Sequence, residues 1–319
     1  MKILAIAFLL MASIAGNVSA QTPDTPVNCD SCEEWNQPVK PFNIFGNTWY
    51  VGVKGLSAVL VTGPKGHILL DGGMPQSAPL IAANIRALGF RVEDVKFILN
   101  SHAHWDHAGG IHALQRATGA VVVASASAAK VLQSGTNGVD DPQYQATPVI
   151  NIARVDKVKV IGEGDVVTAG PLGLTAHMTP GHTPGGTTWT WVSCEGSRCL
   201  NVVYADSLNP YASGDFRYTG NSSDQGNGKN KTADISVSFA ASIARVAALK
   251  CDIIISVHPN MTDVMEKAAK RTADSNPFID ANGCRDYAKE ASDLLSKRLA
   301  MERGEVIPGA AKDTAHHSH

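Results

Sequence analysis

The sequence lacks an excess of charge of either sign. Its 27 Lys and Arg residues nearly balance 29 Asp and Glu residues, which gives a formal net charge of −2 at pH 7. Binding to nucleic acid or to an anionic membrane surface depends on clustered positive charge, so neither partner is predicted. The chain also lacks long apolar runs after its first residues, and we therefore predict no membrane anchor.

The one apolar run covers residues 3–14, after the positive charge of Lys2 and before a Val-Ser-Ala segment at 18–20. This pattern is typical of a secretory signal peptide that is cleaved after Ala20. The run is too short to span a bilayer comfortably, and no cysteine stands at the cleavage position to take a lipid. We expect residues 1–20 to be removed and the remainder to be periplasmic.

Six cysteines fit an oxidising compartment. Pairing by proximity joins Cys29 to Cys32, Cys194 to Cys199, and Cys251 to Cys284, although six cysteines allow fifteen pairings. The Cys29/Cys32 spacing also occurs in redox and zinc sites. The sequence has no second pair of this spacing, which favours a structural disulfide.

The composition, 44% hydrophobic and 18% charged, is that of an ordinary globular protein. We predict an irregular N-terminal arm at 21–41, one domain at 42–304 without an internal linker, and a disordered tail at 305–319. Short apolar strands alternate with amphipathic helices in both halves of the domain. Predicted strands lie at 42–53 (a hairpin), 56–62, 67–71, 95–100, 121–124, 158–161, 166–178 (interrupted at 170–171), 187–192, 201–204 and 253–257. Predicted helices lie at 76–88, 111–116, 127–132, 232–249, 261–274 and 284–302, and predicted loops at 134–150 and 209–231. This α/β pattern predicts two sheets packed face to face with helices outside.

A cluster of metal-binding side chains follows the predicted strand at 95–100, in the run His-Ala-His-Trp-Asp-His at 102–107. The carboxyl ends of strands are where α/β proteins usually carry their chemistry. Imidazole and carboxylate suit zinc, and on a tight loop His102 and His104 can face one ion while Asp106 and His107 face a second. The alternative is a polar loop whose histidines cap backbone groups, but crowded imidazoles gain little without an ion.

Two further histidines end structural elements. His182 lies in the Pro- and Gly-rich turn 179–186, and His258 follows the buried strand at 253–257. Taken alone, each is also explained as a solvated turn histidine or a hydrogen-bonded core histidine. The remaining histidines of the domain are His67, His112 and His177, and we expect them to be structural. For His177, a position behind the metal ligands is also considered.

Together these motifs resemble the metallo-β-lactamase superfamily. The resemblance is carried by the run at 102–107, Thr-Pro-Gly-His-Thr at 179–183, and the strand-end His258. The segments 46–52, 66–73 and 204–208 (Tyr-Ala-Asp-Ser-Leu), with the two later cysteine pairs, are similar to class B β-lactamases of the third subclass. The resemblance spans nearly all of residues 40–300. It implies a four-layer αβ/βα sandwich of two facing mixed β-sheets with outer helices.

The resemblance implies two Zn²⁺ ions and a ligand set for each. The first ion would be held by His102, His104 and His182, and the second by Asp106, His107 and His258. Other β-lactamase subclasses use a cysteine in the second site, and no cysteine stands near a matching strand end here.

The implied activity is zinc-dependent hydrolysis of the β-lactam amide bond of penicillins, cephalosporins and carbapenems, by a hydroxide held between two zinc ions. We expect a monomer with a small-molecule substrate. The residues expected to take part in catalysis are Asp106, His182 and Ser207, and those expected to contact substrate are Ser207, Asn209 and Trp105.

Two alternatives remain. A lactonase or thioesterase-like hydrolase of the same fold would be favoured if Asp206 bridged both metals. A periplasmic metal-binding module without catalysis is disfavoured because the expected sites keep an open coordination position, whereas structural zinc sites are closed.

Overall fold

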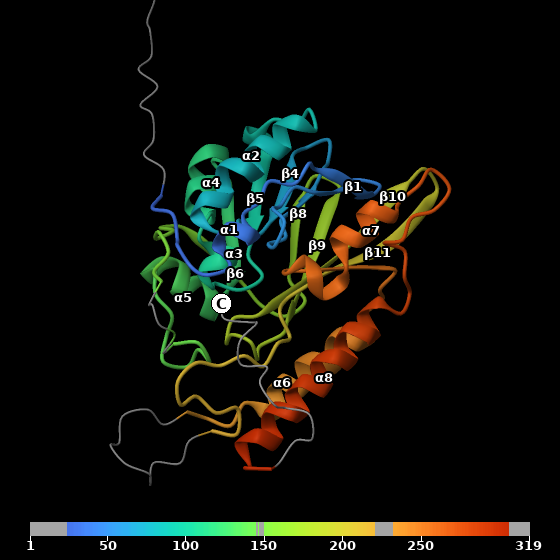
Figure 1. The fold of residues 1–319 in the computed structure, drawn as a ribbon. Coiled ribbons are helices and arrows are strands. Elements are labelled where there is room, and N and C mark those ends of the chain that lie inside the picture. The colour runs from blue at the N-terminus through green and yellow to red at the C-terminus, as the bar shows by residue number, and fades with distance from the viewer. Residues whose placement is uncertain (1–23, 145, 147–149, 221–231, 306–319) are drawn as a thin grey trace, which may run out of the picture.

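The computed structural model describes residues 24–144, 146, 150–220 and 232–305. The predicted signal peptide and residues 306–319 of the predicted tail lie outside them. Two mixed β-sheets stack face to face, with helices on both outer faces (Figure 1). The predicted four-layer αβ/βα sandwich is therefore confirmed. Within the described residues, no helix has the length and apolar character needed to cross a membrane.

The first sheet has seven strands in the order β1 to β7. Neighbours are antiparallel from β1 to β4 and parallel from β4 to β7. The strands are β1 (Phe42–Phe45), β2 (Thr48–Tyr50), β3 (Val59–Val61), β4 (His67–Leu70), β5 (Val95–Leu99), β6 (Val121–Ser125) and β7 (Val158–Ile161). The predicted hairpin at 42–53 is present, and its turn contains Gly46 with a positive φ of 52°.

The second sheet has five strands in the order β12-β11-β10-β9-β8. Only the β11–β12 pair is parallel. The strands are β8 (Val166–Ala169), β9 (Leu172–Met178), β10 (Thr187–Glu195), β11 (Arg198–Ala205) and β12 (Ile253–Ser256). The predicted interruption at 170–171 is the turn between β8 and β9, where Gly170 has a φ of 61°.

Strand residues alternate between two apolar layers because side chains on a strand point to opposite faces. In β5, Leu99 belongs to the core between the sheets, while Ile98 packs against the helices outside. In β11, Tyr204 faces the other sheet and Val203 faces outward. The strands β4 and β12 are buried on both faces and read as continuous apolar runs, whereas β8 and β9 alternate between buried and more exposed residues.

Helices cover each outer face. The seven-stranded sheet packs against α2 (Ala78–Ala87), α4 (Ile111–Thr118) and α5 (Ala126–Ser134), and the five-stranded sheet against α6 (Ser236–Ala248) and α8 (Gly283–Glu302). The short helices are α1 (Cys32–Trp35), α3 (Trp105–Ala108) and α7 (Val264–Lys270), with 3₁₀ turns at Pro75–Ser77, Val92–Asp94 and Pro259–Thr262.

Three local predictions need correction. The helix predicted at 261–274 is shorter, because Asp263 adopts a φ of 53° and separates the 3₁₀ turn at Pro259–Thr262 from α7. The arm predicted to be irregular contains α1. The histidine run is not loop throughout, since its second half forms α3.

All three disulfides predicted by proximity are present: Cys29–Cys32, Cys194–Cys199 and Cys251–Cys284. The second closes the β10–β11 hairpin, and the third ties the start of β12 to the start of α8.

Candidate metal centre

The six predicted ligands converge from both sheets. Four of them lie on the segment 102–107, which follows β5 of the seven-stranded sheet. His182 lies in the turn between β9 and β10, and His258 follows β12, both in the five-stranded sheet. All six side chains are buried. The site therefore lies where the two sheets meet at their ends.

The tight turn that carries His182 depends on the glycine before it. A Cβ on Gly181 would lie 1.9 Å from a ring carbon of Phe239 in α6, and Gly181 has a positive φ of 155°. Only glycine fits this approach without displacing the helix. The Thr-Pro-Gly-His pattern thus sets the position of His182 against α6.

The first group consists of His102, His104 and His182, whose candidate ligand atoms all lie within 4.8 Å of one another. The Nε2 atom of His102 is buried and has no hydrogen-bond partner. A buried polar atom without a partner is costly, and a metal ion would satisfy it. These three residues fit a zinc ion.

The second group consists of Asp106, His107 and His258. Asp106 Oδ2 lies 3.1 Å from His107 Nε2 and 3.3 Å from His258 Nε2, and the two nitrogens are 3.2 Å apart. Ligand atoms around a tetrahedral zinc with bonds of about 2.0–2.1 Å stand about 3.3–3.4 Å from one another. The three atoms therefore have the spacing of one face of such a site. His102, Asp106 and His107 also form a close group, so the two sites adjoin.

Hydrogen bonds from the outward nitrogens hold four of the rings. Such partners fix the tautomer and orientation of a metal-binding histidine. The pairs are His102 Nδ1 with Asp206 Oδ1 (2.6 Å), His104 Nε2 with the Asp141 carboxylate (3.1 Å), His182 Nδ1 with the Asn209 carbonyl (2.8 Å) and His258 Nδ1 with the Gly55 carbonyl (3.2 Å). Each ring consequently presents its other nitrogen to the site.

The electrostatic environment suits metal ligands. Burial, reinforced by the neighbouring imidazoles, lowers the pKa of His102 well below its usual value, and burial also lowers the pKa of His258. Burial alone would raise the pKa of Asp106, but His107 and His258 hold it well below its usual value. Neutral imidazoles and an ionised carboxylate are the forms that bind zinc.

Asp206 does not stand among the ligand atoms. Its Oδ1 contacts the outward nitrogen of His102, and its backbone carbonyl accepts a hydrogen bond from Tyr287 in α8. Burial raises the pKa of this carboxyl well above its usual value. The geometry makes Asp206 a residue that positions His102, and a bridging role for it is not observed.

Sequence reasoning missed two residues in the loop predicted at 134–150. Asp141 contacts His104, and Gln143 Nε2 lies 3.4 Å from both His104 Nδ1 and His182 Nε2. Both side chains are buried. A polar Asp-Asp-Pro-Gln run at 140–143 is the only local signal, and it resembles many surface turns.

Trp35 of α1 was also missed. Its ring lies 5.3 Å from His258 and stacks at 6.3 Å on Trp105, measured between ring centroids. The Cys29–Cys32 disulfide lies beside this helix. An aromatic wall therefore borders the second group of ligands.

Of the three residues predicted to contact substrate, Trp105 and Asn209 are each near a proposed ligand, in the chain or through a contact, and Ser207 is close to Asn209. Trp105 begins α3, and Ser207 is buried, with its hydroxyl 3.4 Å from the backbone nitrogen of Asn209. Asn209 touches His182 through its backbone carbonyl. Their roles toward substrate stay predictions.

Three histidines expected to be structural lie apart from the six ligands. The ring of His67 packs against the ring of Phe90. His112 forms polar contacts with Asp24 and Arg116, and His177 is hydrogen-bonded to the hydroxyl of Thr190.

The chain is an α/β sandwich in which two adjoining groups of side chains could each hold a metal ion. The family profile of the Metallo-beta-lactamase superfamily matches residues 51–194. With this profile and the structural relatives below, the chain belongs to the metallo-β-lactamase superfamily.

Solved structures of high similarity are subclass B3 enzymes or carry the metallo-β-lactamase name. MEM-A1, a subclass B3 metallo-β-lactamase from a soil metagenome library, is 49% identical, with a TM-score of 0.79 over 85% of this chain and 99% of that one. The Rm3 metallo-β-lactamase is 48% identical, with a TM-score of 0.80 over 87% of this chain and 100% of that one.

Curated relatives are more distant. A hydroxyacylglutathione hydrolase of Anaeromyxobacter dehalogenans is 31% identical over 60% of this chain and 55% of its own length. The N-acyl homoserine lactonase AttM of Agrobacterium fabrum is 29% identical over 40% of this chain and 55% of its own length. The chain thus spans about half the length of the curated relatives it matches.

Proposed function

We propose that this protein hydrolyses the amide bond of β-lactam antibiotics with two bound zinc ions. The observation that carries the proposal is the convergence of six buried ligands in two adjoining groups. Similarity to a subclass B3 metallo-β-lactamase over 85% of this chain supports it. The second group contains two histidines and an aspartate, in line with the absence of a free cysteine among the described residues.

Each of the two ligand groups would hold one zinc ion. His102, His104 and His182 would hold the first, and Asp106 with His107 and His258 the second. When bound, zinc polarises the substrate carbonyl as a Lewis acid and lowers the pKa of water to roughly 7, so that a nucleophile exists at neutral pH.

Protein groups orient the reactants. The pKa of Asp106 is held low, so its carboxylate stays ionised and can accept a hydrogen bond from the attacking water. The water oxygen would bond to the carbonyl carbon, the C–N bond would then break, and the proton lost by the water would be returned to the departing nitrogen. Asn209, whose backbone carbonyl contacts His182, and the neighbouring Ser207 would bind the substrate carboxylate. Trp105 with Trp35 would form an apolar wall for the ring substituents.

The proposal includes export and a monomeric state. Three disulfides support folding in an oxidising compartment. The signal-peptide pattern at 1–20 supports a periplasmic location.

A lactonase or thioesterase-like activity is the second candidate, and the curated relatives favour it. The position of Asp206 speaks against it. Its carboxylate contacts the outward nitrogen of His102, away from the ligand atoms, and so does not bridge the two groups.

The test combines turnover and metal content. We expect the zinc-loaded protein to hydrolyse a chromogenic cephalosporin and a carbapenem, and a chelator to abolish both reactions. The variant His102→Ala should lose bound zinc and at least about 100-fold in kcat/KM, since even outer partners of metal ligands contribute about 10–100-fold.

The matched control is His112→Ala, because His112 lies on α4 among Asp24 and Arg116. This variant should keep its zinc and its rate. Full zinc and full activity in His102→Ala would contradict the proposed site. Faster hydrolysis of a lactone or thioester than of every β-lactam would favour the second candidate.

A further inference from the structure

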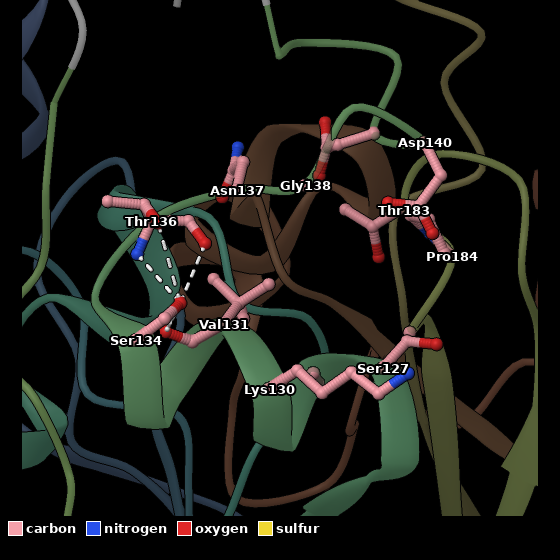
Figure 2. Close-up of a pocket in the computed structure, with 14 residues that line it drawn as sticks. Ser127, Lys130, Val131, Ser134, Thr136, Asn137, Gly138, Asp140, Thr183 and Pro184 are labelled. Carbon is pink, nitrogen blue, oxygen red and sulfur yellow. Dashed lines mark hydrogen bonds between the residues drawn. The ribbon is translucent and has the colours of Figure 1, made fainter.

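A pocket lies beside the segments that carry the first group of proposed metal ligands. It encloses about 260 Å³ between α5 and the segment 136–141, with 183–185 as its third wall (Figure 2). Drug-sized ligands occupy about 300–1,000 Å³, so this pocket fits a molecule smaller than a substituted β-lactam. None of the six predicted metal ligands lines it.

The walls carry polar groups that the rest of the described chain does not satisfy. Thr183 is buried, and its hydroxyl has no hydrogen-bond partner. Lys130 and Asp140 also line the pocket, and among the described residues neither has an ion-pair partner. Both of these side chains are exposed, whereas the Thr183 hydroxyl is buried, so a ligand in the pocket would satisfy the hydroxyl and pair with the two exposed charges.

Hydrogen bonds link Ser134 and Thr136 in one wall of the pocket. Ser134 accepts a hydrogen bond from the Thr136 backbone nitrogen and donates one to the Thr136 carbonyl, as the dashed lines in Figure 2 show. Figure 2 also shows Lys130 extending along α5 toward Ser127, in the first turn of that helix. A helix N-terminus favours negative charge, so this end suits a carboxylate beside the Lys130 ammonium. Asp140, on the opposite segment, suits an ammonium group.

The pocket is also lined by residues that neighbour each proposed ligand of the first group, either in the chain or through a contact. Ala103 lies between His102 and His104 in the chain, and Thr183 directly follows His182. Asp141, whose carboxylate is 3.1 Å from His104 Nε2, forms part of the wall. A molecule in the pocket therefore contacts the segments that position all three histidines.

We propose that this pocket binds a small zwitterion, a molecule of amino-acid size with one carboxylate and one ammonium group, and that its occupancy is coupled to the first metal site. The carboxylate meets Lys130 at the start of α5, the ammonium meets Asp140, and the ligand's polar atoms satisfy the Thr183 hydroxyl. Because coupling is reciprocal, the ligand and the metal change one another's affinity by the same factor.

Isothermal titration of the zinc-loaded protein tests the binding. γ-Aminobutyrate or the shorter β-alanine should bind saturably, whereas butyrate and butylamine, which carry one charge each, should bind about tenfold more weakly. The variants Lys130→Gln and Asp140→Asn should each weaken zwitterion binding about tenfold. Matched changes at exposed positions outside the pocket, Lys157→Gln and Asp156→Asn, should leave it within about twofold.

Two results would overturn the binding proposal: no saturable binding of either zwitterion, or unchanged affinity in Lys130→Gln. Coupling is tested by comparing the zwitterion dissociation constant of zinc-loaded and zinc-free full-length protein, with circular dichroism to confirm that both are folded. We expect a difference of at least about fivefold. Equal constants would overturn the coupling. Neither measurement uses a β-lactam, so neither depends on the proposed reaction.

Discussion

Asp141 shows how much a single carboxylate beyond the ligands can contribute. It accepts from the Gln143 backbone nitrogen at 2.7 Å and contacts His104 Nε2 through both oxygens. Although burial alone would lower the pKa of His104, the Asp141 carboxylate raises it. A more basic imidazole is a stronger metal donor.

We expect Asp141→Asn to weaken zinc binding at the first site about tenfold, at the lower end of the range for outer partners, because the amide oxygen still accepts from His104 but the charge is lost. Competition with a chromophoric chelator measures this affinity. Asp156→Asn is the matched control, since its carboxylate is exposed and lies outside the pocket and the ligand groups. An affinity within twofold of the unaltered protein would show that the Asp141 charge does not act on the metal.

Long-range contacts explain which residues the sequence could not reveal. The six proposed ligands could be named from the sequence because each stands in a local pattern, at a strand end or in a Pro-Gly turn. Asp141 and Gln143 reach His104 across 37 and 39 residues of chain. Their role depends on the path of an irregular loop, which has no periodicity to read. Trp35 reaches His258 in the same way, through the position of α1.

At the level of elements, α8 is anchored by Glu302 at its C-terminal end. This side chain is 5% exposed, pairs with Arg298, and accepts hydrogen bonds from the backbone nitrogens of Tyr218 and Thr219. Burial alone would raise the pKa of Glu302, but these partners hold it below the usual 4.5. The ionised form is therefore stabilised by folding.

Glu302→Gln should lower the free energy of unfolding at pH 7 by about 2 kcal/mol, since charge-assisted hydrogen bonds contribute about 1.5–3 kcal/mol. Because the folded pKa is depressed, this stabilisation is fully present above pH 4.5, the unfolded pKa, and is lost as the pH falls through the folded pKa. Urea unfolding of both proteins between pH 3 and pH 7 measures the difference. The control is Glu290→Gln, an exposed change on the same helix. A difference independent of pH would contradict the role of the charge.

The disulfides stabilise their elements unequally. Cys251–Cys284 closes a sequence separation of 33 residues, whereas Cys194–Cys199 closes one of 5. Loop-closure entropy then predicts about 4 kcal/mol for the former and about 2 kcal/mol for the latter. Paired Cys→Ala variants, compared by chemical denaturation under oxidising conditions, should show this order. The reverse order would mean that native packing around Cys194 and Cys199 outweighs loop length.

At the scale of the whole molecule, the proposed metal centre lies where the two sheets meet. The segment 102–107 belongs to the seven-stranded sheet, while His182 and His258 belong to the five-stranded sheet. The layer order was predictable because apolar strands and amphipathic helices alternate along the chain. Which ends of the two sheets approach one another depends on long-range packing, including that of Trp189 and Tyr204 between the sheets. No local sequence pattern encodes this packing.

Because the proposed metal ligands come from both sheets, we expect the removal of zinc to destabilise the entire domain. With free zinc at about 1,000 times its dissociation constant, binding adds about 4 kcal/mol to stability. For a domain of this size that corresponds to roughly 8–16 °C in Tm. Thermal unfolding of chelator-treated protein should show this decrease while far-ultraviolet circular dichroism is retained, because the apolar layers and disulfides remain.

Readdition of zinc should restore the Tm, and readdition of magnesium should not, since imidazole-rich sites favour zinc over magnesium. In His258→Ala, which leaves the first group intact but removes the contribution of β12 to the second, the chelator-induced decrease should be smaller than in the unaltered protein. A Tm unchanged by chelation would show that the sheets are held together without the metal. An equal decrease in His258→Ala would assign the coupling to His182 and the first ion alone.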